Sequence, residues 1–203
     1  MVGVRAKDHE DKKRLILDTA SGLFAKQGFA KTSISELSSA CRASKAWIYH
    51  YFPTKEDILF TLLHDFLIVV RSRLEEIDVE DLAPEDALHH FVLECLRIYD
   101  DYRINYPILF NEMTVLTDEQ QKELRAIEDV PVKLLTTIVA KIRPEIATAA
   151  AFRTPITLLI YGTINWTYTW FNPDGKLRLE ELAVLVKDFV LGGIQTVSVA
   201  KPR

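Results

Sequence analysis

Apolar residues recur at intervals of three and four along most of the chain, which is the spacing of one face of an α-helix. The first such segment covers residues 12–27, with apolar-face positions Leu15, Ile16, Thr19, Ala20, Leu23 and Phe24. Gly28 follows, and a residue without a Cβ suits the left-handed conformation that closes a helix. No segment alternates apolar and polar residues long enough to form a strand. The pattern predicts an all-α fold.

A second, short helix is predicted to begin near Ile34. Ser33 and Glu36 are three residues apart, which is the spacing of a capping box in which the serine hydroxyl satisfies a free backbone N–H. The inward positions of this helix are Ile34, Leu37, Ser38 and Cys41. We expect it to end near Cys41, after about two turns.

A third helix follows after the tight connection Arg42-Ala43. Ser44 can cap it, and Pro53 stops it because proline lacks a backbone N–H and disfavours helix at the preceding residue. Two short helices joined by a three-residue connection are typical of a helix-turn-helix, whose second helix enters the major groove of DNA. We therefore predict a helix-turn-helix in residues 34–53. The alternative from periodicity alone is a small three-helix bundle with Tyr49, Tyr51 and Phe52 in its core.

Helical spacing continues to the end of the chain. A fourth helix is predicted from Thr54 toward Ile77, a fifth over 84–102, a short sixth opened by Pro107, and a seventh from Thr117-Asp118 with Pro131 as a kink or a break. A break at Arg143-Pro144 precedes an eighth over about 148–171. The turn at 172–175 precedes a ninth, from Leu179 to about Val199. About nine helices are expected in total.

The charge distribution sharpens this picture. The chain has 203 residues and a net charge of −4. Residues 12–55 nevertheless hold eight Lys and Arg against two acids, a local charge of +6 that leaves −10 for the rest. A basic head on an acidic body is expected if only the head meets phosphates.

The predicted third helix reads from Ser44 to Phe52. Ile48 and Phe52, four residues apart, are expected to face the core, while Lys45, Trp47 and Tyr49 remain for DNA. The segment resembles the N-terminal signature of the tetracycline-repressor (TetR) family, together with Arg14 to Ala20, Leu23 to Ala25, Gly28-Phe29, Thr32 to Ile34 and Pro53 to Glu56. Two departures stand out: Arg42 replaces a turn glycine, and Ala46-Trp47 replaces Gly-Thr.

The resemblance implies a DNA-binding domain over residues 1–56 and a helical effector-binding and dimerisation domain over 57–203. The protein would be a homodimeric repressor released from double-stranded operator DNA by a small-molecule effector. The residues assigned to the DNA are Thr32, Ser33, Arg42, Ser44, Lys45, Ala46, Trp47, Tyr49, His50, Tyr51 and Lys55. Among these, Thr32, His50, Tyr51 and Lys55 are expected to contact phosphates.

The resemblance also places the dimer interface in the last two long helices. Their apolar faces are wider than one monomer needs, and Gly162, Gly192 and Gly193 permit close helix approach. The alternative is that these faces complete the core of the monomer.

The aromatic segment 165–176 is similar to the branch of the family that senses acyl-CoA thioesters, including fatty acyl-CoA and phenylacetyl-CoA. An aromatic-lined slot with a polar handle such as Asn165 suits an acyl thioester. Arginines meet CoA phosphates through a bidentate fork. The candidate ligand residues are Arg73, Arg97, Tyr99, Tyr102, Arg103, Phe110, Asn165, Trp166 and Trp170. Each of the aromatic residues has core packing as its alternative role.

Other classes of protein find little support in the sequence. There is no phosphate-binding glycine loop, zinc-protease helix or nucleophile elbow, so we expect neither an enzyme nor a cofactor nor a metal site. Cys41 and Cys95 are expected to be reduced core residues. No apolar run is long enough for a membrane helix, and no secretory signal is present, so a cytoplasmic protein is expected. The competing function is a helical carrier of lipids or small molecules that does not bind DNA.

Overall fold

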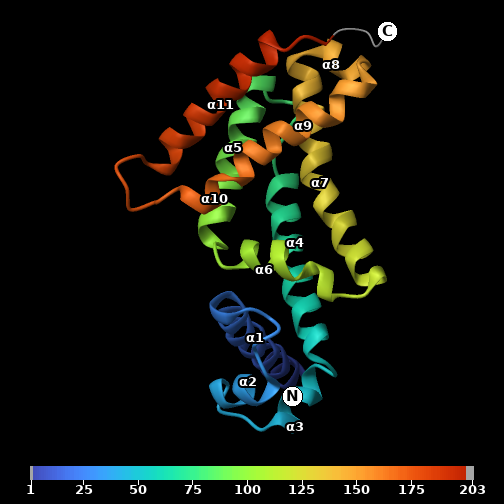
Figure 1. The fold of residues 1–203 in the computed structure, drawn as a ribbon, viewed down its shortest axis with the longest axis vertical. Coiled ribbons are helices and arrows are strands. Elements are labelled where there is room, and N and C mark those ends of the chain that lie inside the picture. The colour runs from blue at the N-terminus through green and yellow to red at the C-terminus, as the bar shows by residue number, and fades with distance from the viewer. Residues whose placement is uncertain (1, 200–203) are drawn as a thin grey trace. The chain divides into compact units, whose positions relative to one another are not determined.

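The computed structural model describes residues 2–199, with side chains from residue 7 onward. Throughout this part of the chain the regular structure is helical and contains no strand, which confirms the all-α prediction (Figure 1). The helices are α1 (Val2–Gln27), α2 (Ile34–Ala40), α3 (Lys45–Tyr51), α4 (Lys55–Glu75), α5 (Pro84–Asp101), α6 (Asn105–Glu112), α7 (Asp118–Ile142), α8 (Pro144–Thr148), α9 (Ala150–Asn165), α10 (Thr167–Trp170) and α11 (Leu179–Thr196), with a 3₁₀ turn, η1, at Met113–Val115.

The chain divides into two compact units. Unit 1 comprises Met1–Leu67 and Ile104–Arg125, and unit 2 comprises Ile68–Arg103 and Ala126–Arg203. Helices α4 and α7 each contribute residues to both units. The two units are defined by the contacts within each of them. The boundary at residue 56 separates a DNA-binding from an effector-binding domain, and it stays a prediction.

Side-chain caps set the starts of α2, α3 and α4. The Ser33 hydroxyl accepts the backbone N–H of Glu36 at 3.1 Å, and the Ser44 hydroxyl accepts that of Trp47 at 3.1 Å. At α4, Thr54 and Asp57 cap each other, each side chain accepting the other's backbone N–H at 3.0 Å. Each bond satisfies a backbone N–H that the first turn of a helix leaves without a partner. Because each cap lies within three residues of the N–H that it bonds, these helix starts could be predicted from the sequence.

Two backbone positions have positive φ. Gly28 has φ +83°, the predicted left-handed helix end. Arg42 has φ +53°, in the turn between α2 and α3. A side chain with a Cβ is disfavoured in this region, so Arg42 occupies a strained position that a glycine would adopt freely.

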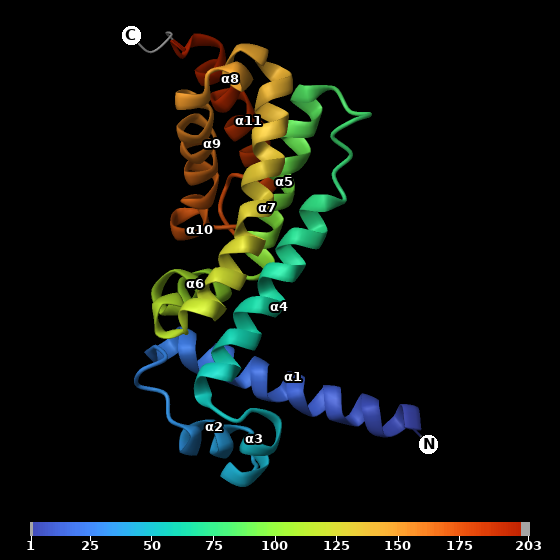
Figure 2. The same cartoon turned by 90° about the vertical axis from the view of Figure 1, so that its right-hand side faces the viewer.

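The head of unit 1 is built on α1. Figure 2 shows α1 running between the α2–α3 pair and α6. Its buried face carries Ile16, Ala20 and Phe24, as the periodicity predicts. Leu15, also assigned to that face, is about half exposed, so that assignment is wrong. The core of the α2–α3 pair comes from Leu37, Cys41, Ile48 and Phe52.

In unit 2, α11 lies along α5, and α9 packs on the same helix (Figure 1). Leu88, Phe91 and Val92 of α5 are fully buried, and α11 contributes Leu182, Ala183, Val186, Val190 and Ile194 to the core. The side chains of α5 that line this core repeat at helical spacing, so the sequence identified them correctly.

Several boundaries differ from the predictions. The segment predicted as one helix over 148–171 is divided among α8, α9 and α10. The interruptions lie at Ala149 and Trp166, neither of which is a helix breaker in a sequence. Helix α7 continues through Pro131, so the alternative of a break there is wrong. Helix α6 begins at Asn105, two residues before the predicted Pro107.

Candidate DNA interface and effector site

Helix α3 separates a buried face from a polar and aromatic outer face. Ile48 and Phe52 are buried, as predicted. Lys45, Ala46, Tyr49 and His50 are exposed, while Trp47 and Tyr51 are half-buried. The outer face therefore offers one cation, one histidine and three aromatic side chains to a partner, which suits contacts with both phosphates and base edges.

Tyr51 lies at the centre of a group of rings on this helix. Its ring centroid is 5.0 Å from that of Trp47, 5.1 Å from that of His50 and 4.8 Å from that of His9 on α1. Aromatic pairs at these separations stabilise one another beyond the area that they bury. The predicted reader Trp47 is thus supported by Tyr51, one turn further along α3.

The structure gives two of the predicted phosphate contacts an internal role. The Lys55 ammonium donates to the backbone carbonyls of Phe29 and Thr32, at 2.8 and 2.9 Å, and lies 4.0 Å from the centroid of the Phe29 ring. Thr32 is only 2% exposed, and its hydroxyl donates to the Gly28 carbonyl at 2.9 Å. Both side chains hold the loop between α1 and α2, so we leave them out of the proposed interface.

Glu112 is a residue of this region that the sequence did not reveal. The backbone N–H of Phe29 donates to its carboxylate at 3.0 Å, which ties the α1–α2 loop to the end of α6. The two residues are 83 positions apart in the sequence, and no local pattern connects them.

Ser33, Ser44 and Arg42 complete the predicted DNA set. The two serines are exposed, and each hydroxyl already accepts the cap bond of its helix. A hydroxyl that accepts one bond still has a proton to donate to a phosphate. Arg42 is exposed in the turn between the two helices. All three positions are compatible with DNA contacts, which stay predictions.

The predicted phosphate-binding arginines of unit 2 are surrounded by acids. Arg73 pairs with Glu94 at 2.5 Å and with Asp101 at 2.6 Å. Burial opposes the Arg73 charge, but the hydrogen bonds to Asp101 and Glu94 outweigh it and raise the pKa of Arg73. The other two arginines also lie near carboxylates: Arg97 is 3.8 Å from Glu94, and Arg103 is 3.2 Å from Asp100.

Tyr99 and Asn165, two predicted ligand residues, are brought together inside unit 2. The Tyr99 hydroxyl donates to the Asn165 side-chain carbonyl, which joins α5 to α9. Tyr161 also forms side-chain hydrogen bonds with both residues, and Cys95 forms one with Tyr99. Burial raises the pKa of the Tyr161 phenol and of the Cys95 thiol, so both stay protonated at neutral pH.

Tyr161 and Cys95 belong to this polar cluster, although they were not predicted as site residues from the sequence. Cys95 precedes Tyr99 by four residues, and Tyr161 precedes Asn165 by four, so each pair shares one helix face. This spacing was the available signal. Beside the cluster lies a cavity of about 10 Å³, lined by Tyr99, Arg103 and residues of α10, among others. It holds about one water molecule, so an acyl group would need the surrounding helices to open.

The remaining predicted ligand residues are spread over the surface. Trp166, Trp170 and Phe110 are 66%, 55% and 53% exposed. At this exposure their rings are open to solvent, and their role as ligand contacts stays a prediction. Phe110 moreover belongs to unit 1, where it stacks on Tyr106, and Tyr102 is half-buried at the end of α5.

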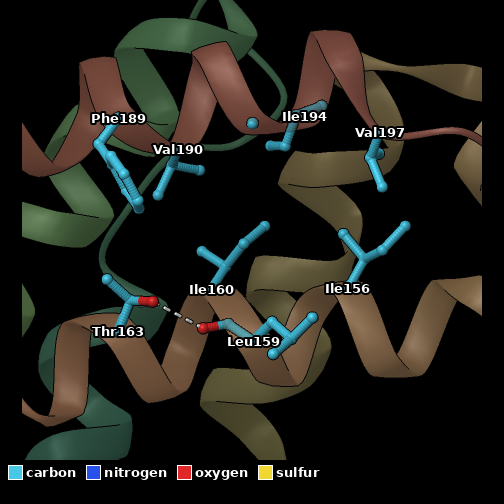
Figure 3. Close-up of a pocket in the computed structure, with 9 residues that line it drawn as sticks. Ile156, Leu159, Ile160, Thr163, Phe189, Val190, Ile194 and Val197 are labelled. Carbon is cyan, nitrogen blue, oxygen red and sulfur yellow. Dashed lines mark hydrogen bonds between the residues drawn. The ribbon is translucent and has the colours of Figure 1, made fainter.

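An apolar groove separates α9 from α11 (Figure 3). It has a volume of about 200 Å³, and its walls are Ile156, Leu159, Ile160 and Thr163 of α9 facing Phe189, Val190, Gly193, Ile194 and Val197 of α11 and its end. Leu159 and Phe189 are 72% and 70% exposed. Two large apolar side chains at a groove rim are typical of a surface that another molecule covers.

Two features of residues 2–199, as far as their side chains are described, bear on other functions. No helix there is long and apolar enough to cross a membrane. No group of three or more His, Cys, Asp or Glu side chains is arranged to hold a metal ion.

Comparison with known proteins agrees with this geometry. The family described as "Bacterial regulatory proteins, tetR family" matches residues 16–62, which include the helix-turn-helix. The family described as "Tetracyclin repressor-like, C-terminal domain" matches residues 81–194, more than half of the chain.

Individual relatives support the same family. The HTH-type transcriptional regulator HbdR of Aromatoleum sp. (strain CIB) is 30% identical over 79% of this chain and 69% of its own length. A TetR-family regulator from Bordetella parapertussis 12822 is 28% identical, with a TM-score of 0.83 over 93% of this chain and 98% of that one. AibR, solved with isovaleryl coenzyme A and operator DNA, is 24% identical, with a TM-score of 0.71 over 89% and 96% of the two chains. The chain is therefore a DNA-binding transcriptional regulator of the TetR family.

Proposed function

We propose that this regulator is a homodimeric repressor that reads its operator with α3 and is released from it by an acyl-CoA thioester. In this proposal residues 1–56 bind DNA, and residues 57–203 bind the effector and the second copy. The observation that carries the DNA-binding part is the division of α3 into a core face, Ile48 and Phe52, and an outer face of Lys45, Trp47 and Tyr49.

The outer face of α3 suits the major groove for chemical reasons. Lys45 is in the first turn, where helix-turn-helix proteins contact base edges, and a lysine can donate to guanine acceptors. The exposed Ala46 lets the helix backbone approach closely. Trp47 offers an apolar ring edge to thymine methyl groups, and His50 and Tyr51 flank the readers within reach of phosphates.

Two substitutions test this assignment. Lys45→Ala and Tyr49→Ala should each weaken operator binding about tenfold or more, the cost of losing one good base contact. Lys122→Ala, which removes an exposed lysine from α7, is the matched control and should bind normally. Gel shifts with DNA fragments from the region upstream of its gene measure the affinity, and circular dichroism shows whether each variant is folded. If both α3 variants bind the operator as tightly as wild type does, α3 does not enter the major groove.

The homodimer is supported by the exposed groove between α9 and α11. Its walls are almost wholly apolar, and Gly193 on its wall has no atom within 4 Å of the place where a Cβ would stand. A helix of a second copy could therefore approach closely, in the manner of helix pairs that bury small residues against each other. The alternative, that this face completes the monomer core, is disfavoured by the exposure of Leu159 and Phe189.

The effector class is supported by the polar cluster of Cys95, Tyr99, Tyr161 and Asn165. A thioester carbonyl accepts hydrogen bonds, and the Tyr161 phenol keeps its proton at neutral pH. The Tyr99 hydroxyl, which donates to Asn165, would have to exchange that acceptor for the ligand. In this proposal the CoA phosphates bind near Arg73 or Arg103 and replace the carboxylates that now pair with these arginines. AibR carries isovaleryl coenzyme A on the same fold, but at 24% identity the likeness concerns the fold alone.

A panel of ligands tests the effector. Acetyl-, isovaleryl-, phenylacetyl- and palmitoyl-CoA are added to the operator complex, and at least one should release the DNA. By thermodynamic reciprocity, operator DNA should weaken the binding of that thioester by the same factor. Free coenzyme A is the control for the phosphates. If no thioester changes either the gel shift or the melting temperature, the acyl-CoA proposal fails while the DNA-binding assignment stands. A carrier without DNA function, the other candidate, predicts ligand binding with no operator complex at all.

A further inference from the structure

The N-terminal part of α1 contacts α3, the proposed reading helix. His9 lies seven residues before Ile16, on the α1 face that later enters the core, and its ring centroid is 4.8 Å from that of Tyr51. Lys13, one turn further, places its ammonium 5.6 Å from the centroid of the Phe52 ring. The last two residues before Pro53 are thus covered by α1 residues that precede the matched family segment, which begins at residue 16.

The charge of this part of α1 argues against a simple phosphate-binding arm. Residues 7–15 contain four Lys and Arg and three acids. Lys12 pairs with Asp8 at 2.5 Å, and Arg14 lies 3.8 Å from Asp18. Since its charges nearly balance, the segment has little to add to counterion release, the sequence-independent part of DNA affinity.

We propose that His9 is a positioning residue for operator binding, which holds Tyr51 and, through Tyr51, the indole of Trp47 in the orientation that meets the bases. The proposal rests on the assignment of α3 to the major groove. The contacts form one row, from His9 to Tyr51 at 4.8 Å and from Tyr51 to Trp47 at 5.0 Å. A side chain held before binding loses less conformational entropy in the complex, so fixing Trp47 raises affinity without a new contact to DNA.

The operator-binding experiment compares four proteins. His9→Ala should weaken specific binding about three- to tenfold, the value of one aromatic pair, whereas His9→Phe keeps a ring and should stay within about twofold of wild type. Leu15→Ala, at an exposed α1 position with no ring contact described, is the matched control. The salt dependence is measured for each protein, and the slope of log K against log salt should be the same for all.

Two outcomes of this experiment overturn the proposal. If His9→Ala and His9→Phe both weaken binding and both make the slope shallower by about one unit, His9 contacts a phosphate itself. If both variants bind as wild type does, the ring contact carries no affinity. Melting temperatures, expected to differ by less than about 2 °C, show whether the variants are folded.

A spectroscopic measurement needs no DNA and therefore separates this proposal from the assignment of α3. The chain has three tryptophans, so Trp166→Phe together with Trp170→Phe leaves Trp47 as the sole indole emitter. In that background His9→Ala should increase acrylamide quenching of Trp47 by at least about 1.5-fold, since the ring becomes more mobile, and His9→Phe should not. Equal quenching in all three proteins would overturn the positioning role even if α3 binds the operator. Normal operator binding by Lys45→Ala and Tyr49→Ala would instead overturn the assignment of α3 alone.

Discussion

Glu112 and Lys55 hold the backbone of Phe29 through its N–H and its carbonyl. Its N–H donates to the carboxylate of Glu112, with 3.0 Å between the two atoms, while its carbonyl accepts from the ammonium of Lys55 at 2.8 Å. Glu112 ends α6 and Lys55 begins α4, so the backbone of this one loop residue joins the end of α1 to two other helices of unit 1. A buried or partly buried hydrogen bond to a charged group is among the stronger polar contacts in a protein.

Glu112→Ala should lower the free energy of unfolding by about 1–2 kcal/mol, because the Phe29 N–H loses its acceptor. Glu112→Gln keeps an oxygen at the same place and should lose less than half of that. Urea unfolding, followed by circular dichroism, measures both values. Asn111→Ala, at the exposed neighbour, is the control. An equal loss in Glu112→Ala and Asn111→Ala would mean that the bond adds nothing to stability.

Arg42 should respond to substitution according to its positive φ. Arg42→Gly should raise the free energy of unfolding by about 0.5–1 kcal/mol, since glycine avoids the steric cost of the left-handed region but loses more chain entropy on folding. Arg42→Ala keeps the Cβ and should bring no such gain. Thermal unfolding of the two variants separates backbone strain from loss of the side chain. A gain of equal size in both would show that the arginine side chain, and not the backbone, is the source.

His89 makes unit 2 sensitive to pH. Its Nδ1 is buried and has no hydrogen-bond partner among the described residues, and burial, with the nearby charges of His90 and Lys187, lowers the pKa of His89 below its ordinary 6.5. Asp86 and Asp188 act in the opposite direction. The unfolded chain therefore takes up this proton at a higher pH than the folded one. The stabilising contribution of neutral His89 is complete above pH 6.5 and is lost as the pH falls through the lower folded value.

The experiment compares wild type with His89→Gln between about pH 7.5 and 5. The stability of wild type relative to the variant should decrease as the pH is lowered. Leu93→Ala, a packing change on the same helix without a titrating group, should differ from wild type by a constant amount. A pH-independent difference for His89→Gln would show that the imidazole titrates alike in both states.

The groove between α9 and α11 gives a direct prediction about assembly. Phe189→Glu places a charge at its rim and should turn a dimer into a monomer at micromolar concentration, because pairing would bury an unpartnered carboxylate. Gln195→Glu adds the same charge on α11 outside the groove lining and should leave the assembly unchanged. Sedimentation equilibrium measures the mass of each protein. If Phe189→Glu is still a dimer, the interface lies on another surface of the protein.

The helices of the N-terminal region, residues 12–55, could be predicted from local signals in the sequence. Ser33, Ser44 and Thr54 each act within three residues of their own position, so the helix starts that they cap were predictable. The alternation of buried Ile48 and exposed Tyr49 on α3 followed equally from helical spacing.

Roles that depend on distant parts of the chain were not predictable. A lysine that follows a recognition helix resembles a phosphate contact, yet Lys55 turns toward carbonyls more than twenty residues earlier. From the sequence alone, Arg73 is a candidate phosphate ligand. In the structure it pairs with two acids of α5, Glu94 and Asp101. Trp166 resembles a core residue by type, but it interrupts the helix at the end of α9 and faces solvent.

The exposure of Leu159 and Phe189 bears on how much of this regulator a cell must make. If pairing through these residues is needed for operator binding, the active species grows with the square of the chain concentration while single chains predominate. The dissociation constant of the dimer would then set a threshold concentration, below which single chains leave the operator empty and expose these apolar side chains to other proteins.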